Sequence, residues 1–102
     1  MGSRIDLQNK LEDILGSRNV YFQPPENLKI KYPAIIYSLN NINLRFADNM
    51  PYMKGKNYTV ILIHTDPDNE VVDNMLAAFS YISFERNYIS ENLYHYVFEL
   101  YF

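Results

Sequence analysis

The chain has 102 residues, a formal net charge of −3 and no cysteine. This length suits a single domain with a modest core, and the lack of cysteine excludes disulfides and thiolate metal sites. No cluster of Lys and Arg is present to neutralise phosphates, so sequence-specific nucleic-acid binding is not expected. No apolar run is long enough for a signal peptide or a membrane helix, and we expect one soluble, intracellular domain over residues 1–102.

Charge and aromatic content are the other global features. Residues 65–102 contain one Lys or Arg and seven Asp or Glu, whereas residues 1–33 contain five and four. Ten Tyr and six Phe make 16% of the chain aromatic without any Trp. Such amphipathic rings suit surfaces that are half core and half interface, or they line a small β-rich core with their hydroxyls in water. Composition leaves both interpretations open.

The N-terminal segment is predicted to be a short amphipathic helix followed by a brief strand. Apolar residues recur there at i, i+4, i+7 and i+8, namely Leu7, Leu11, Ile14 and Leu15. Ser3 suits the N-cap and Gly16 the stop. Val20–Phe22 forms the strand, which ends at the Pro24-Pro25 pair.

Two stronger strand patterns follow. Tyr32-Pro33 imposes extended backbone, and residues 34–39 then read as a strand. Residues 58–64 are rich in β-branched side chains and almost continuously apolar, which predicts burial on both faces. We expect this second strand to be the centre of the sheet.

The stretch between these strands, residues 40–56, is too long for a tight hairpin and mixes aromatic with polar residues. We expect a projecting, ordered loop with a contact role, held in shape by Arg45, Asp48 and Asn49. The alternative is an extended twisted hairpin that turns at Gly55.

A helix is predicted from residue 66 onward, because Asp66 suits the N-cap, Pro67 the first helical position, and acidic residues the first turn. Its apolar stripe is Val72, Met75, Leu76 and Phe79. The same capping explains Asp66 and Asp68 without a catalytic role for this pair of carboxylates.

The C-terminal residues predict a hairpin that turns near residues 90–92, with strands over residues 84–89 and 93–102. In the last strand every even position is apolar and demands a core, while the odd row, which includes His95 and Glu99, demands partial cover. The strand should be central, or an edge held by another subunit. The whole chain is then an α+β domain with a mostly antiparallel sheet and two helices, in the order α-β-β-β-α-β-β.

Catalytic patterns are weak. His64 and His95 lie on predicted strands and could approach Asp66 or Asp48, as a metal site or a general base would require. Their spacing matches no ligand motif, and strand histidines in a Tyr-rich chain are more often structural. The sequence predicts no enzyme activity, no cofactor and no metal site.

Several short motifs together resemble a known family. They are Tyr32 to Tyr37, Ala47-Asp48-Asn49, Tyr58-Thr59-Val60, Asp66-Pro67-Asp68, Phe84 to Tyr88 and Glu91 to His95. From about residue 19 to its end the chain is similar to the tail-terminator, or tail-completion, proteins of phages and prophages of Gram-positive bacteria. Glu91 stands where the family pattern favours Asp.

The resemblance implies a structural virion protein assembled in the cytoplasm of the host bacterium and located in the neck. Its copies would form a hexameric ring that caps the tail tube and joins it to the head connector or stopper protein. The partners implied are further copies of the chain, the tail tube protein and that connector, with DNA passing through the lumen and no membrane contact. An acidic C-terminal third suits a channel that does not grip DNA, or it merely confers solubility.

Eight residues are candidates for partner binding: Arg45, Asp48, Asn49, Tyr52, Arg86, Glu91, Tyr101 and Phe102. Arg86 is the sole basic residue after Lys56, and we expect it to pair with an acidic residue of a neighbour, such as Glu91 or Asp48, or of its own chain. The alternatives to a tail terminator are another neck component, such as a head-completion or stopper protein, and a small metal-dependent enzyme using His64 and His95.

Overall fold

A computed structural model describes residues 4–47 and 50–102, with side chains over residues 4–40 and 56–102. The elements are α1 (Arg4–Leu15), β1 (Val20–Phe22), β2 (Ala34–Ala47), β3 (Met50–His64), α2 (Val71–Ala78), β4 (Ile82–Ser90) and β5 (Leu93–Tyr101). The chain is an α+β protein with the predicted element order. No helix of the described residues is long and apolar enough to cross a membrane.

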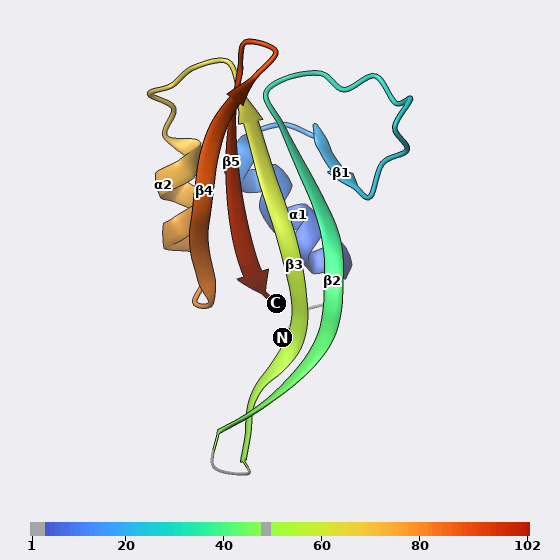
Figure 1. The fold of residues 1–102 in the computed structure, drawn as a ribbon, viewed down its shortest axis with the longest axis vertical. Helices are drawn as coiled ribbons and strands as arrows, with labels where there is room; N and C mark the ends of the chain where they lie inside the picture. Colours follow the sequence, from blue (N-terminus) through green and yellow to red (C-terminus); the bar gives the residue numbers. More distant parts are fainter. Residues whose placement is uncertain (1–3, 48–49) are drawn as a thin grey trace.

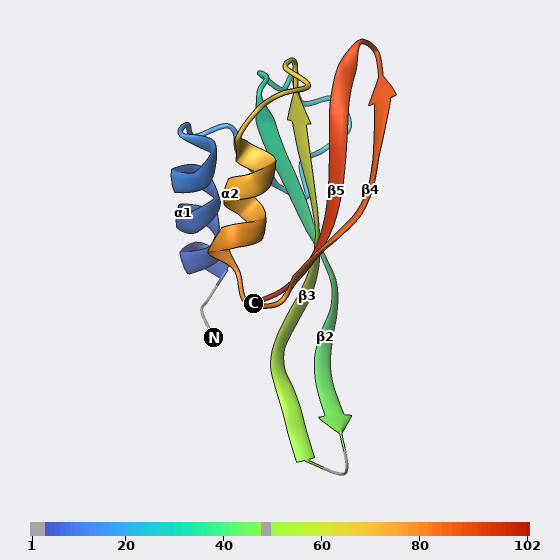
Figure 2. The same ribbon diagram turned by 90° about the vertical axis from the view of Figure 1, so that its left-hand side faces the viewer.

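The five strands form one sheet in the order β1-β2-β3-β5-β4. The β1–β2 pair is parallel and the other three pairs are antiparallel. Strand β3 is central, as predicted, because its continuous apolar run has strands on both sides. Both helices pack on one face of the sheet (Figures 1 and 2).

The core lies between this helix-covered face and the two helices. The even row of β5 contributes Tyr96, Phe98 and Leu100, which confirms the pattern predicted for the terminal strand. Leu7 and Leu11 of α1 are fully buried against the sheet. The rest of this core consists of Val20, Ile35, Tyr37, Tyr58, Val60, Leu62, Met75 and Phe79.

Helix α1 ends as the sequence predicts. Gly16 has φ of +80°, the left-handed conformation that terminates helices, and its N–H donates to the carbonyl of Glu12 at 2.8 Å. The proposed N-cap, Ser3, lies outside the described residues.

The prediction of a loop at residues 40–56 is wrong. Strands β2 and β3 continue through this stretch and pair with each other as far as Ala47 and Met50, so the extended hairpin is correct. Its turn is not at Gly55, because Gly55 pairs with Asn43 within the ladder. The hairpin extends beyond the end of β5 as an arm (Figure 2).

The predicted start of α2 is also wrong, because the helix begins at Val71. Asp66 uses its carboxylate in a turn, where Oδ1 accepts from the N–H of Asp68 at 2.9 Å. The side chain of Asn69 instead accepts from the first helical N–H groups, those of Val71 at 3.1 Å and Val72 at 3.4 Å. A side-chain oxygen in this position satisfies donors that have no partner within the helix.

The predicted stripe of α2 is partly wrong as well. Met75 and Phe79 are buried and Val72 packs against the core, but Leu76 is exposed. Val71 packs on the core, so the contact stripe runs along one side of the helix from Val71 to Phe79 and leaves Leu76 outside.

The predicted C-terminal hairpin is confirmed. Glu91 and Asn92, with φ of 52° and 65°, form a two-residue connection between β4 and β5. Two successive positive φ angles match the right-handed twist of the strands that they join. Asn tolerates this conformation better than most residues, whereas Glu91 is an unusual choice.

Candidate interaction surface

Strand β4 is the most exposed regular element in the part of the chain that the structure describes. All its residues after Ile82 are exposed, although they include Phe84, Tyr88 and Ile89. It lies at an edge of the sheet, with β5 on one side. An edge strand presents backbone N–H and C=O groups that another strand or loop can pair.

A bulge divides β4. The register shifts between Phe84 and Arg86, so Glu85 is the extra residue on the bulged strand. Phe84 faces the helices and meets the ring of Phe98 edge-on at 5.6 Å, whereas Arg86 pairs with Val97 on the other face of the sheet. The bulge thus turns a charged residue toward the face that the helices leave open.

Arg86, Tyr88 and His95 form a cluster on this open face. The guanidinium carbon of Arg86 lies 5.8 Å from the ring centre of Tyr88, within cation–π range. Tyr88 stacks on its cross-strand partner His95, with ring centres 4.7 Å apart and planes 14° from parallel. The Nδ1 atom of His95 lies 3.1 Å from the carbonyl oxygen of Leu93, which can only accept a hydrogen bond.

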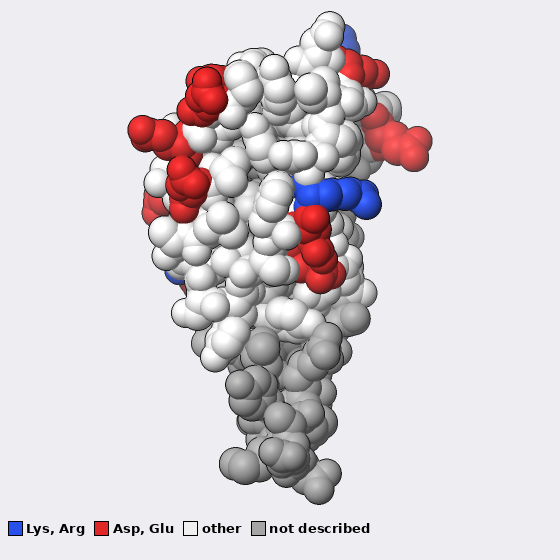
Figure 3. Space-filling view, turned by 60° about the vertical axis from the view of Figure 1, so that its left-hand side comes forward, with Lys and Arg blue, Asp and Glu red and all other residues white. Residues whose placement is uncertain are grey.

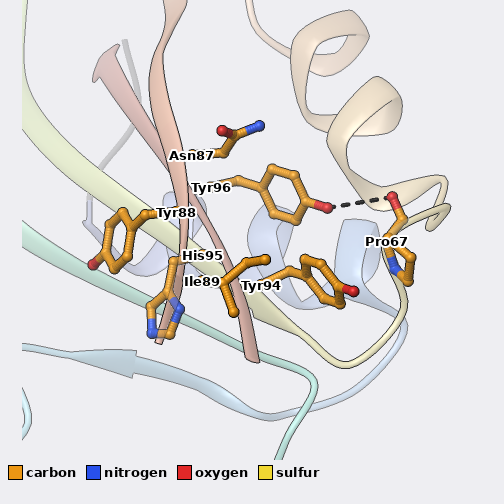
Figure 4. Close-up of a pocket in the computed structure, with 7 residues that line it drawn as sticks. All are labelled: Pro67, Asn87, Tyr88, Ile89, Tyr94, His95 and Tyr96. Atoms are coloured by element: carbon orange, nitrogen blue, oxygen red, sulfur yellow. Dashed lines mark hydrogen bonds between the residues drawn. The ribbon is translucent and has the colours of Figure 1, made fainter. Parts of the chain in front are cut away.

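A pocket of about 330 Å³ lies where the β4–β5 hairpin meets the loop before α2. Figure 4 shows the rings of Tyr94 and Tyr96 pointing from β5 toward Pro67, and the hydroxyl of Tyr96 donates to the Pro67 carbonyl at 3.3 Å. Ile89 also lines the pocket and is 67% exposed. The remaining lining residues are Asn87, Tyr88 and His95.

Three exposed acidic residues are close in sequence to residues that line this pocket. Asp66 and Asp68 flank Pro67, and Glu91 lies in the turn two residues after Ile89; all three are exposed. Figure 3 shows acidic side chains gathered over α2 and the loop that precedes it. The combination of aromatic rings and peripheral carboxylates suits an apolar segment with positive charge beside it.

The two histidines do not share a site. In the β3–β5 register Ile63 pairs with His95 and His64 with Tyr94, so His64 and His95 lie on opposite faces of the sheet. His64 does reach the neighbourhood of Asp66, but its Nδ1 accepts from the backbone N–H of that residue at 3.0 Å. Within the described residues no three His, Cys, Asp or Glu side chains gather as a metal site requires.

The predicted partner-binding residues fall in three places. Arg45 and Tyr52 lie on the arm, where the register shifts between Arg45 and Phe46; Asp48 and Asn49 lie outside the described residues. Arg86 and Glu91 belong to the β4–β5 hairpin. The structure therefore places Arg86 and Glu91 on one hairpin and the arm residues at the far end of β2 and β3.

Tyr101 and Phe102, two of the candidates for partner binding, are attached to their own sheet. The N–H of Tyr101 donates to the Tyr81 carbonyl at 2.9 Å, and Phe102 exchanges two backbone bonds of 3.1 Å with Lys56. The Phe102 ring also meets Phe79 at 6.0 Å. The last two residues therefore contribute to the fold, and their role in an interface stays a prediction.

A polar cluster lies at the base of the arm. The Nδ2 atom of Asn40 donates to Asn57 Oδ1 at 2.9 Å and to Thr59 Oγ1 at 2.6 Å. Asn57 is buried, and its own Nδ2 has no hydrogen-bond partner among the side chains that the structure describes. A buried donor left without a partner destabilises the folded chain by about 1–3 kcal/mol.

Sequence analysis missed the pocket, although the signal was present. Once the turn at residues 91–92 is fixed, Tyr88 must face His95 and Ile89 must face Tyr94. The contribution of Pro67 could not be foreseen, because it was assigned to a helix that begins four residues later. Comparison of the chain with protein-family models, with curated proteins and with solved structures finds no match.

Proposed function

We propose that this protein is a structural component of the neck of a tailed bacteriophage, a tail terminator whose copies form a ring on the end of the tail tube. The short motifs from Tyr32 to His95 are similar to those of that family, and an α+β domain is what the resemblance implies. The proposal is for a protein that works by assembly and not by catalysis.

The observation that carries the proposal is the exposure of strand β4. Edge strands of monomeric proteins are usually short, strongly charged or covered, because an open edge invites pairing with another chain. Here a nine-residue edge strand leaves Phe84, Tyr88 and Ile89 exposed. A surface of this kind is stable in a cell when a further copy or another protein covers it.

The two edges of the sheet differ, which favours a ring over a two-fold dimer. One edge is β4, and the other is β1, a three-residue strand followed by the long connection to β2. When one surface of a subunit binds a different surface of the next, the contact is heterologous and closes into a ring or continues as a filament. A tail terminator requires the closed form.

The test uses the purified protein, tail tubes assembled from the tail tube protein of the same genome, and the connector. Light scattering during size-exclusion chromatography should give a particle of about six times the 12.1 kDa chain mass, and negative-stain electron microscopy should show it on tube ends. Tubes grown in its presence should stop elongating. A protein that binds the connector but not the tube would be another neck component, and one that binds neither would refute the proposal.

A further inference from the structure

The connection between β1 and β2, residues 23–33, has features that suit an aromatic-lined pocket. Pro24 and Pro25 lie near its start, and the N–H of Leu28 donates to the Pro25 carbonyl at 3.1 Å. The loop also exposes Leu28 and Tyr32. Proline-rich segments are recurring ligands of aromatic-lined grooves, because their restricted backbone loses little entropy on binding.

Charge is complementary between the two surfaces. Lys29 and Lys31 follow Leu28 and are exposed, with Glu26 as the one acidic residue of the loop. On the other surface, exposed Asp66 and Asp68 flank the lining residue Pro67 in sequence, and exposed Glu91 follows the lining residue Ile89 by two positions. Opposite charges at the rim of a contact raise the association rate and select the orientation of the partners.

Topology prevents a chain from filling its own pocket. The loop follows β1, at one edge of the sheet, and the pocket adjoins β4, at the other. Figure 1 shows the loop at the upper right, while the β4–β5 turn and the loop before α2 lie at the top and upper left. Both surfaces are therefore at the same end of the long axis but on opposite sides of the molecule.

We infer that the loop of residues 23–33 of one copy docks into the tyrosine-lined pocket of a second copy, with Pro25 and Leu28 against Tyr94 and Ile89. Lys29 and Lys31 then lie near Asp68 and Glu91 of that neighbour. The contact is heterologous and leaves the long axes of neighbouring chains side by side, as in a ring. This inference rests on the proposed function in that both require self-association.

The first experiment exploits the lack of cysteine in the chain. Leu28→Cys and Ile89→Cys proteins are mixed with oxidised glutathione as the oxidant, and the disulfide-linked dimer is followed on non-reducing gels. We expect the mixed Leu28–Ile89 dimer to form at least about ten times faster than either self-dimer. As the matched control, each of these two proteins is also mixed with an Ile5→Cys protein, in which the cysteine is at an exposed position of α1. Equal rates for all pairs would overturn the inference.

The second experiment uses two blocking variants at exposed positions, Leu28→Asp in the loop and Ile89→Asp beside the pocket. Each alone should lose assembly, because every contact needs one intact surface of each kind. Their mixture should form a one-to-one dimer and nothing larger, since the loop variant retains its pocket and the pocket variant its loop. Ile5→Asp should assemble like the unmodified chain, and circular dichroism checks that all variants are folded.

A mixture that stays monomeric, or variants that assemble normally, would refute the docking.

A charge-reversal experiment adds a further check. The double variant Lys29→Glu, Lys31→Glu should assemble weakly, and mixing it with the double variant Asp68→Lys, Glu91→Lys should restore assembly. The docking and the tail-terminator function are refuted by different results. Rings that cap tail tubes without the Leu28–Ile89 link would remove only the docking, whereas the link without capping would remove only the tail-terminator function.

Discussion

Strands β4 and β5 form one hairpin and pair along its length apart from the bulge at Glu85, yet β5 is buried or half-buried throughout and β4 is exposed from Ser83 onward. Both contain aromatic residues, four of the nine in β5 and two of the nine in β4. Their positions in the sheet also differ: β5 lies between β3 and β4 beneath the helices, and β4 lies at the edge. Within one hairpin, the inner strand therefore stabilises the fold, whereas the outer strand is available for contact with another molecule.

The largest expected effect tests this division directly with the cross-strand partners Phe98 and Phe84. Phe98→Ala removes a fully buried ring and should lower the free energy of unfolding by about 3–5 kcal/mol. Phe84→Ala removes a 42% exposed ring and its edge-on contact, and should lower it by about 1 kcal/mol. Urea unfolding followed by circular dichroism measures both. Equal losses would mean that β4 belongs to the core as much as β5 does.

The end of β5 is where fold and interface are hardest to separate. Deleting Tyr101 and Phe102 removes three backbone hydrogen bonds and the ring contact with Phe79. We expect the free energy of unfolding to fall by about 4 kcal/mol, because each of the three bonds and the aromatic pair contributes about 1 kcal/mol. Thermal unfolding measures this loss, with Phe102→Leu as the control that retains the backbone bonds. A truncated chain of unchanged stability that fails to assemble would assign the pair to an interface.

Alkaline pH probes the helix-covered face. Burial raises the pKa of Tyr58 above its usual 10.0, the nearby Tyr37 raises it further, and Arg4 opposes the shift. Because the unfolded chain ionises Tyr58 first, stability is unaffected below about pH 10 and falls as the pH rises toward the higher pKa of the folded state. Tyr58→Phe should flatten this fall, whereas Tyr81→Phe, at an exposed position, serves as the control. An identical slope in all three proteins would contradict the assignment.

The sequence predicts the covered half of the molecule well. The apolar periods of α1 and β5 and the continuous apolar run of β3 require burial, and burial admits few arrangements. The errors lie where the hydrophobic signal is weak. Residues 40–47 carry Asn, Arg and a mixture of apolar side chains and look like a loop, but the long β2–β3 ladder extends them as strand.

The prediction of where α2 starts was wrong for a local reason. Asp66-Pro67 has the composition of a helix start, but the Asp66 side chain closes a turn, and Asn69, one residue before the N-cap Glu70, accepts from the first helical N–H groups. The two patterns differ by only a few residues in sequence and by small energies. The pocket at Pro67 depends on this turn, so the site could not be predicted while the helix was misplaced.

Arg86 gives the smallest expected change in stability and the sharpest test of the outer strand. Arg86 is exposed on β4 and pairs with Val97 of β5. Glu99 lies two residues after Val97 on β5, on the same face of the sheet. The contact of Arg86 with Tyr88 and any exposed ion pair contribute about 0–1 kcal/mol, so Arg86→Ala should leave the melting temperature almost unchanged.

Assembly of the Arg86→Ala protein then decides between the two interpretations of this residue. If Arg86 bridges to an acidic residue of a neighbour, the variant should fold normally and lose ring formation in light scattering, because an uncompensated carboxylate remains in the contact. Arg86→Lys should retain part of the assembly, since it keeps the charge but not the planar stacking on Tyr88. Normal rings in the Ala variant would limit Arg86 to its own chain, and the outer strand would then contribute to assembly through Phe84, Tyr88 and Ile89 alone.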